Sequence, residues 1–171
     1  TTNFVAQLPL WGISIALEHE GEVVLGTISQ PMLGTRYIAH KNGGAHRLDV
    51  AMRRKTEIHA SSNSELKEAL GFHCYGYKPE DQKRALRLEP ALSSRVRAVR
   101  RLGVAVVEAA WVAQGLADYS LLIGIKPWDV AAGALLVREA GGRVLTPRGK
   151  EWTIKDSEIL FVSAALEQKI I

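Results

Sequence analysis

Residues 123–142 read IGIKPWDVAAGALLVREAGG, and small or aliphatic side chains fill most positions between an aspartate and a pair of glycines. Such a run predicts a helix that is buried on nearly all sides, from Asp129 to Ala140, and the two glycines favour its end. A helix with no polar face must pack against other elements on every side. This segment therefore predicts a layered structure.

The neighbouring segments alternate between helical and strand patterns. Residues 104–115, VAVVEAAWVAQG, are apolar almost throughout and predict a second buried helix that ends near Gly115. Short segments that are strand candidates surround the two helices. These segments lie at residues 95–103, 117–124, 143–146 and 158–163. The alternation predicts layered α/β packing.

The first third of the chain has a different pattern. Residues 11–31 alternate apolar and polar side chains on both sides of Glu20 and Gly21, which is typical of two antiparallel strands joined by a tight turn. The alternation continues to residue 47 around an Asn-Gly-Gly turn, so we expect a meander of three strands over residues 11–47. The meander makes the expected fold a mixed α/β (α+β) class.

Two further helices are predicted at the surface. Residues 79–92, PEDQKRALRLEPAL, place Pro79 and two acidic side chains in a first turn, while Pro90 predicts an early stop or a kink. A last short helix is expected from about Ala164.

Composition sets the class of protein. The 171 residues are 47% hydrophobic and 23% charged, which suits one globular domain with a core. Cys74 is the only cysteine, and no segment resembles a secretory leader or a membrane span. We therefore expect a cytoplasmic protein without a disulfide or a membrane partner. The net charge of +4 suits an anionic ligand, but the basic residues are dispersed, so no nucleic-acid partner is expected.

Asp129 allows two interpretations from the residues alone. As the N-cap of its helix it would accept a hydrogen bond from the first turn and contribute about 1 kcal/mol. Small residues beside it would also let a ligand approach, and a carboxylate there would suit a hard cation such as Mg²⁺. A carboxylate has lone pairs enough for both roles, and the spacing does not separate them.

Other reactive side chains give weaker signals. The five histidines lack the spacings of a zinc site, and Cys74 is expected to be an inert thiol. Glu108 is the lone charge in its apolar helix, and it either pairs inside the protein or reaches the surface. The alternation of four arginines could place two of them towards a phosphate, although a solvated strand face is the simpler interpretation. They are Arg95, Arg97, Arg100 and Arg101.

Four segments together resemble a known family. WDVAAGALLVREAGG resembles the C-terminal signature of the inositol monophosphatase family, the Mg²⁺-dependent, lithium-sensitive phosphatases of sugar and nucleotide phosphates. RRLGVAVVEAAWVAQGLAD is similar to its R-x-x-G-[ST]-A-A segment with the helix that follows, and YIAHKNGGAHR to its Y-x-A-x-x-G-x-G-A hairpin. The opening TTNFV resembles the end of its motif D-P-x-D-G-T-T-N-F. The segments follow the family's order over nearly the whole chain.

The resemblance implies an architecture and a set of site residues. The fold would be a layered αβαβα sandwich, in which residues 1–60 complete the first sheet and residues 61–171 form the C-terminal α/β layer. Asp129 would bind the metal nearer the leaving oxygen, and the Thr1 hydroxyl would orient the attacking water. Backbone groups would contact the phosphate and line the substrate pocket. These groups belong to Thr1, Thr2, Gly103, Val104 and Ala105, although simple helix packing would explain the last three without the family.

The implied activity is a Mg²⁺-dependent phosphomonoesterase acting on a small phosphorylated substrate. The intact protein would hold two or three Mg²⁺ ions and form a homodimer. The family's catalytic glutamate and its two motif aspartates would precede residue 1, so we expect a C-terminal part that is inactive alone. The alternative is a non-catalytic relative that binds a sugar phosphate or a protein partner.

Two positions depart from the family pattern. Members that take inositol phosphate usually have a Glu seven residues before the WD aspartate, where this chain has Leu122. Val104 replaces the Ser or Thr that follows the pocket glycine. Both changes would remove polar partners for a polyol. The sequence therefore predicts a substrate other than inositol phosphate, such as fructose bisphosphate, histidinol phosphate or a nucleotide 3′-phosphate.

Overall fold

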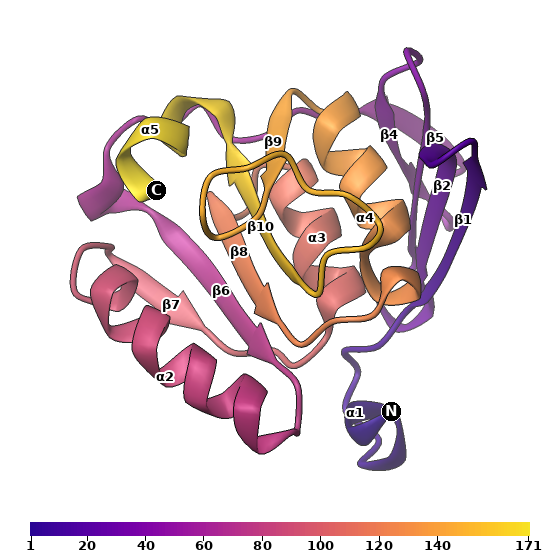
Figure 1. Cartoon of the computed structure of the whole chain (residues 1–171). Helices are drawn as coiled ribbons and strands as arrows, with labels where there is room; N and C mark the ends of the chain where they lie inside the picture. The colour runs from indigo at the N-terminus through magenta and orange to yellow at the C-terminus, as the bar shows by residue number, and fades with distance from the viewer.

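The two apolar helices lie between two five-stranded sheets in the computed structural model, which describes residues 1–171 (Figure 1). Helix α3 (Ala105–Ala113) packs along α4 (Pro127–Glu139). Gly133 permits this approach, since a Cβ atom there would lie 2.5 Å from the Cβ atom of Ala109. The predicted buried helices and layered packing are confirmed.

The first sheet is an antiparallel meander that runs in chain order. Its strands are β1 (Ile13–His19), β2 (Glu22–Gln30), β3 (Thr35–His40), β4 (Ala45–Asp49) and β5 (Arg54–Glu57). Glu20 and Gly21 take positive φ values in the tight turn between β1 and β2, as predicted. The meander is longer than the three strands expected, because β4 and β5 extend it. One face packs on α4, where Gly26 of β2 lies against Ala132.

The second sheet is mixed and has the order β7-β6-β8-β10-β9. Its strands are β6 (Leu70–Tyr75), β7 (Ala98–Arg100), β8 (Tyr119–Ile123), β9 (Gly142–Leu145) and β10 (Glu158–Ser163). Strand β6 lies parallel to both β7 and β8, whereas β10 is antiparallel to β8 and β9. Three adjacent strands therefore end at the same edge.

Surface helices and single turns complete the fold. Helix α2 (Pro79–Ser93) covers the second sheet on the side away from α3, together with α5 (Glu167–Ile170) (Figure 1). Of the two effects expected of Pro90, the early stop is wrong, since α2 continues through this residue to Ser93. Single turns form α1 (Thr2–Val5), η1 (Pro31–Leu33), η2 (Leu66–Glu68) and η3 (Ala164–Leu166).

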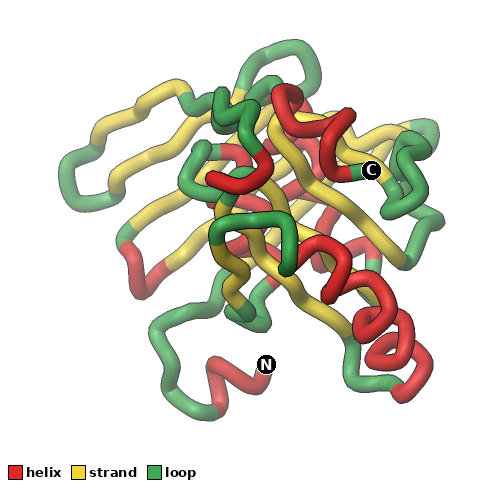
Figure 2. The backbone as a smooth tube through the Cα atoms, turned by 90° about the vertical axis from the view of Figure 1, so that its left-hand side faces the viewer, coloured by secondary structure: helices red, strands yellow, loops and turns green.

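The layers of this chain are thus sheet, helices, sheet, helices, four of the five that the resemblance implies. No helix of the chain is long and apolar enough to cross a membrane. The N-terminal segment with α1 projects at the lower end of the molecule in both views (Figures 1 and 2). This is the end at which α3 and α4 begin.

Candidate active site

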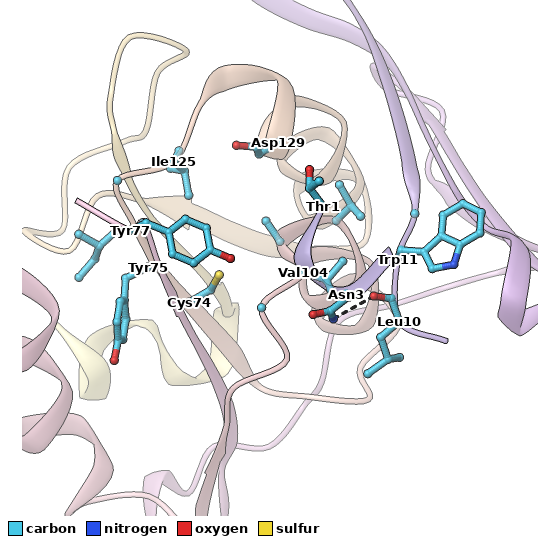
Figure 3. A pocket seen from close by; sticks show the side chains of 17 residues that line it. Thr1, Asn3, Leu10, Trp11, Cys74, Tyr75, Tyr77, Val104, Ile125 and Asp129 are labelled. Atoms are coloured by element: carbon cyan, nitrogen blue, oxygen red, sulfur yellow. Dashed lines mark hydrogen bonds between the residues drawn. The ribbon is translucent and has the colours of Figure 1, made fainter. Parts of the chain in front are cut away.

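A cavity of about 390 Å³ opens where the N-terminal segment meets the starts of α3 and α4 (Figure 3). Its walls come from the ends of β6 and β8, from the loop that follows β7, and from the first turns of the two buried helices. Ligands of open α/β sheets bind at the carboxyl ends of parallel strands. The position of this cavity is therefore typical of a binding site.

The structure brings five of the six predicted site residues to this cavity. They are Thr1, Gly103, Val104, Ala105 and Asp129, which come from three distant segments of the chain (Figure 3). Thr2 does not line the cavity. Its hydroxyl instead lies 2.8 Å from the hydroxyl of Tyr77 at the exposed rim.

Asp129 occupies the third position of α4 rather than the expected N-cap. The helix begins two residues earlier because Pro127 suits a first helical position, and Lys126 is the N-cap. The Asp129 carboxylate still caps the helix, since Oδ2 accepts a hydrogen bond of 3.2 Å from the backbone N–H of Lys126. No hydrogen bond engages Oδ1, so the half-buried carboxylate keeps lone pairs for a ligand in the cavity.

The residues of this chain do not complete a metal site. Asp129 is the only carboxylate that lines the cavity, and no three side chains of His, Cys, Asp or Glu converge anywhere in the chain. Mg²⁺ usually takes one or two carboxylates together with phosphate oxygens and water, and a two-ion site needs more. Asp129 is thus a single candidate ligand.

Asn3 fixes the N-terminal turn against the loop that precedes α3. Its Nδ2 donates to the carbonyl oxygens of Leu10 at 3.0 Å and Leu102 at 3.1 Å. The next residue, Gly103, takes a φ of +69°, which a side chain would disfavour. These contacts hold Thr1, whose side chain makes no capping hydrogen bond, beside the pocket loop.

The remaining walls are largely apolar and aromatic. Trp11, Tyr75 and Tyr77 line the cavity, and the Arg101 guanidinium lies 4.1 Å from the centre of the Tyr75 ring. The two tyrosines were not among the predicted site residues, because no strand was expected at β6. Their signal is the apolar run LGFHC, which ends at Tyr75 and has Gly76 before Tyr77. The cavity walls thus offer aromatic surfaces for stacking and few polar side chains.

Cys74 also lines the cavity, at the end of β6. Burial, with a smaller contribution from the Glu108 carboxyl, raises the pKa of Cys74 to about 12. A thiol with this pKa is not a nucleophile at neutral pH. The expectation of an inert cysteine agrees with this environment.

Leu122 does not face the cavity. It is 0% exposed in the core between the second sheet and the buried helices, while Ile123 and Ile125 reach the cavity wall. Leu122 therefore adds no polar atom to the cavity wall, and the loss of a contact to a polyol at this position stays a prediction. Val104 does line the cavity, so a valine in place of the family's Ser or Thr leaves the cavity wall without that hydroxyl group.

The other charged candidates also have defined positions. Glu108 is 0% exposed and accepts a hydrogen bond of 3.1 Å from the Ser120 hydroxyl, so it pairs inside the protein. Arg101 reaches Tyr75, but none of the four arginines named above lines the cavity and all are exposed. Only Arg100 of the four belongs to strand β7, so exposure to solvent agrees with the expectation, whereas a shared strand face does not.

Comparison with known proteins agrees with this geometry. Residues 1–171 match the family model described as the inositol monophosphatase family. The chain is 33% identical over 171 residues to the fructose-1,6-bisphosphatase/inositol-1-monophosphatase of Thermotoga maritima. It is also 33% identical over 178 residues to the inositol-1-monophosphatase of Mesorhizobium japonicum. Each match covers 100% of this chain and 62% of the relative.

Solved structures share the fold. The inositol monophosphatase of Anabaena superposes with a TM-score of 0.87 at 30% identity, over 99% of this chain and 66% of the other. The extragenic suppressor protein SuhB of Bartonella henselae gives a TM-score of 0.90 at 29% identity, over 99% and 63%. The chain therefore spans less than two thirds of the length of these proteins. The resemblance and the fold class predicted from the sequence are confirmed.

Proposed function

Because this chain belongs to the inositol monophosphatase family, we propose that the full-length protein is a Mg²⁺-dependent phosphomonoesterase acting on a small phosphorylated substrate. The observation that carries the proposal is the convergence of Thr1, the Gly103–Ala105 turn and Asp129 on one cavity. Relatives of the chain are named as phosphatases, and the family is metal-dependent. A cytoplasmic location and a homodimer remain expectations from the resemblance.

Each residue in the cavity has a proposed role. Asp129 binds a cation through the oxygen that helix capping leaves free, and carboxylates outside residues 1–171 complete a site for two or three ions. Mg²⁺ supplies polarisation of phosphate oxygens when it is bound. The Thr1 hydroxyl orients water, the backbone at Thr1 and Thr2 meets the phosphate, and the Gly103–Ala105 turn contacts the leaving group.

The cavity favours an ester other than inositol 1-phosphate. A polyol needs a hydrogen-bonding partner for each hydroxyl that it buries. Val104 offers none, the Nδ2 group of Asn3 already donates to two backbone carbonyls, and the Tyr77 hydroxyl pairs with Thr2. We therefore retain a sugar, polyol or nucleotide phosphate as the substrate class and place inositol 1-phosphate low within it. No observation favours the non-catalytic alternative.

The test is phosphate release by the purified full-length protein from a panel of esters, with Mg²⁺ and with a chelator. We expect release that requires Mg²⁺ and is lost in the Asp129→Asn variant. Asn keeps an oxygen that can accept the Lys126 N–H, so stability should fall by no more than about 1 kcal/mol. Asp156→Asn, in an exposed turn away from the cavity, is the matched control. Absence of release from every ester, or full activity in Asp129→Asn, would contradict the proposal.

A further inference from the structure

Glu108 is a buried carboxyl group that the proposed roles do not use. Its side chain is 0% exposed inside α3, whose other residues are Ala, Val and Trp. Oε2 accepts the hydrogen bond from Ser120, whereas the buried Oε1 has no hydrogen-bond partner. An incompletely paired carboxylate is costly in an apolar interior. Stability therefore does not explain why an ionisable side chain occupies this buried position.

The group lies directly behind the pocket loop. Backbone amides of Val104, Leu102 and Gly103 lie close enough to lower the pKa of Glu108, although none completes a hydrogen bond to Oε1. Gly103 and Val104 line the cavity from the other side, whereas Glu108 does not reach it. Glu108 can therefore act on a ligand only through this loop.

Its charge changes near neutral pH. Burial raises the pKa of Glu108 to about 7, and the hydrogen bond from Ser120 and the loop amides oppose that rise. Cys74 on β6 is the titratable group that faces it, and its own high pKa keeps it neutral. Arg101 and Asp129 act on Cys74. The elements packed on α3, namely α4, β8, β10 and β2, contribute no charge that shifts Glu108.

The two forms of the carboxyl group act differently on the loop. An ionised carboxylate only accepts hydrogen bonds and attracts the amides of residues 102–104 inward. A neutral carboxyl group releases them and can donate to the Ser120 oxygen instead. The amides are then free to face the cavity.

We propose that Glu108 is a positioning residue whose charge sets the conformation of the Leu102–Val104 loop, so that deprotonation of Glu108 weakens substrate binding. This inference rests on the proposed function only in taking a phosphate ester as the ligand. The proton acts as an effector bound behind the cavity wall, and it is coupled to the substrate through the loop.

The test follows KM and kcat of the full-length protein from pH 5.5 to 8.5 with 4-nitrophenyl phosphate as the probe, an ester that needs no hydrogen-bonding partner for a polyol. In the wild type, KM should rise by at least about fivefold as the pH increases through 7. The rise should be absent from Glu108→Gln, which keeps the hydrogen bond to Ser120 and stays neutral. Ionisation of the ester and of the Mg²⁺ ligands is common to all variants, so the difference between profiles reports Glu108 alone. Glu68→Gln, an exposed carboxyl group far from the cavity, should behave like the wild type.

Ser120→Ala gives an independent readout that a purely structural role would not move. Removing its hydrogen bond should shift the rise in KM to higher pH, because that bond lowers the pKa of Glu108. A rise that persists in Glu108→Gln, or stays in place in Ser120→Ala, would overturn the inference. If the wild type hydrolyses no ester, the proposed function fails separately. Calorimetric binding of inorganic phosphate across the same pH range then decides, and an affinity that is equal in wild type and Glu108→Gln at every pH would overturn the role of Glu108.

Discussion

Glu108 also makes the folding stability of this protein depend on pH. Its pKa rises from an ordinary 4.5 to about 7 in the folded state because the carboxyl group is buried. Each pKa unit corresponds to about 1.4 kcal/mol, so the shift amounts to about 3 kcal/mol. This free energy is the cost of keeping a charge in the core above pH 7.

The sign follows from which state holds the proton. Below pH 4.5 the carboxyl group is protonated in both the folded and the unfolded chain, and burial carries no charge penalty. As pH rises towards 7, the unfolded chain releases its proton first, so the folded state loses relative stability. Above pH 7 the loss is complete. Glu108→Gln stays neutral at every pH, so the variant should gain on the wild type over this window.

Urea unfolding at several pH values measures the effect, with the fluorescence of the four tryptophans as the signal. The free energy of unfolding of Glu108→Gln minus that of the wild type should be near zero at pH 4.5 and reach about 3 kcal/mol by pH 8.5. Taking the difference between variant and wild type at each pH cancels the contribution of every other titrating group, including the buried His73. Glu68→Gln should give a flat difference. A flat difference for Glu108→Gln as well would refute the argument that burial raises this pKa.

Three further predictions follow from local geometry. Gly133→Ala should lower the free energy of unfolding by about 1–3 kcal/mol, because its Cβ would lie 2.5 Å from that of Ala109; wild-type stability in urea would contradict the close packing of α3 and α4. Cys74, with a pKa of about 12, should react with a thiol reagent at pH 8 far more slowly than free cysteine while the protein is folded. In urea it should react at the ordinary rate, and equal rates in the folded and unfolded protein would contradict its burial. Residues 1–171 expressed alone should bind Mg²⁺ weakly and release no phosphate, because Asp129 is the only carboxylate in the cavity. Metal-dependent turnover by this chain alone would show that the site lies elsewhere.

Local patterns predicted the elements with the strongest sequence signals. The helices α3 and α4 are apolar and buried almost throughout. The hairpin around Glu20 alternates in sequence, and β2 alternates in burial, although β1 is exposed at nearly every position. Strand β5, RKTE, is exposed at every position, so no alternation marks it. Strand β6 is held by β7 and β8, which follow much later in the chain, and only their pairing makes LGFHCY a strand.

Family resemblance predicted which residues belong to the site better than it predicted where each side chain lies. It identified Thr1 and Asp129, and both line the cavity. It also marked Leu122, whose side chain is buried in the core and adds no polar atom to the cavity wall. Every residue of β8 is buried, so its apolar sequence does not reveal which side chains face which layer.

Asp129 can cap its helix and bind a cation at the same time. A helix start needs one acceptor for a free backbone N–H, and Oδ2 supplies it to Lys126. The same hydrogen bond holds the carboxylate in one orientation at the cavity, leaving Oδ1 without a hydrogen bond. A cation ligand works best when its rotamer is fixed before the ion arrives. Capping therefore prepares this carboxylate to bind a ligand, and the structural role is a condition of the proposed chemical one.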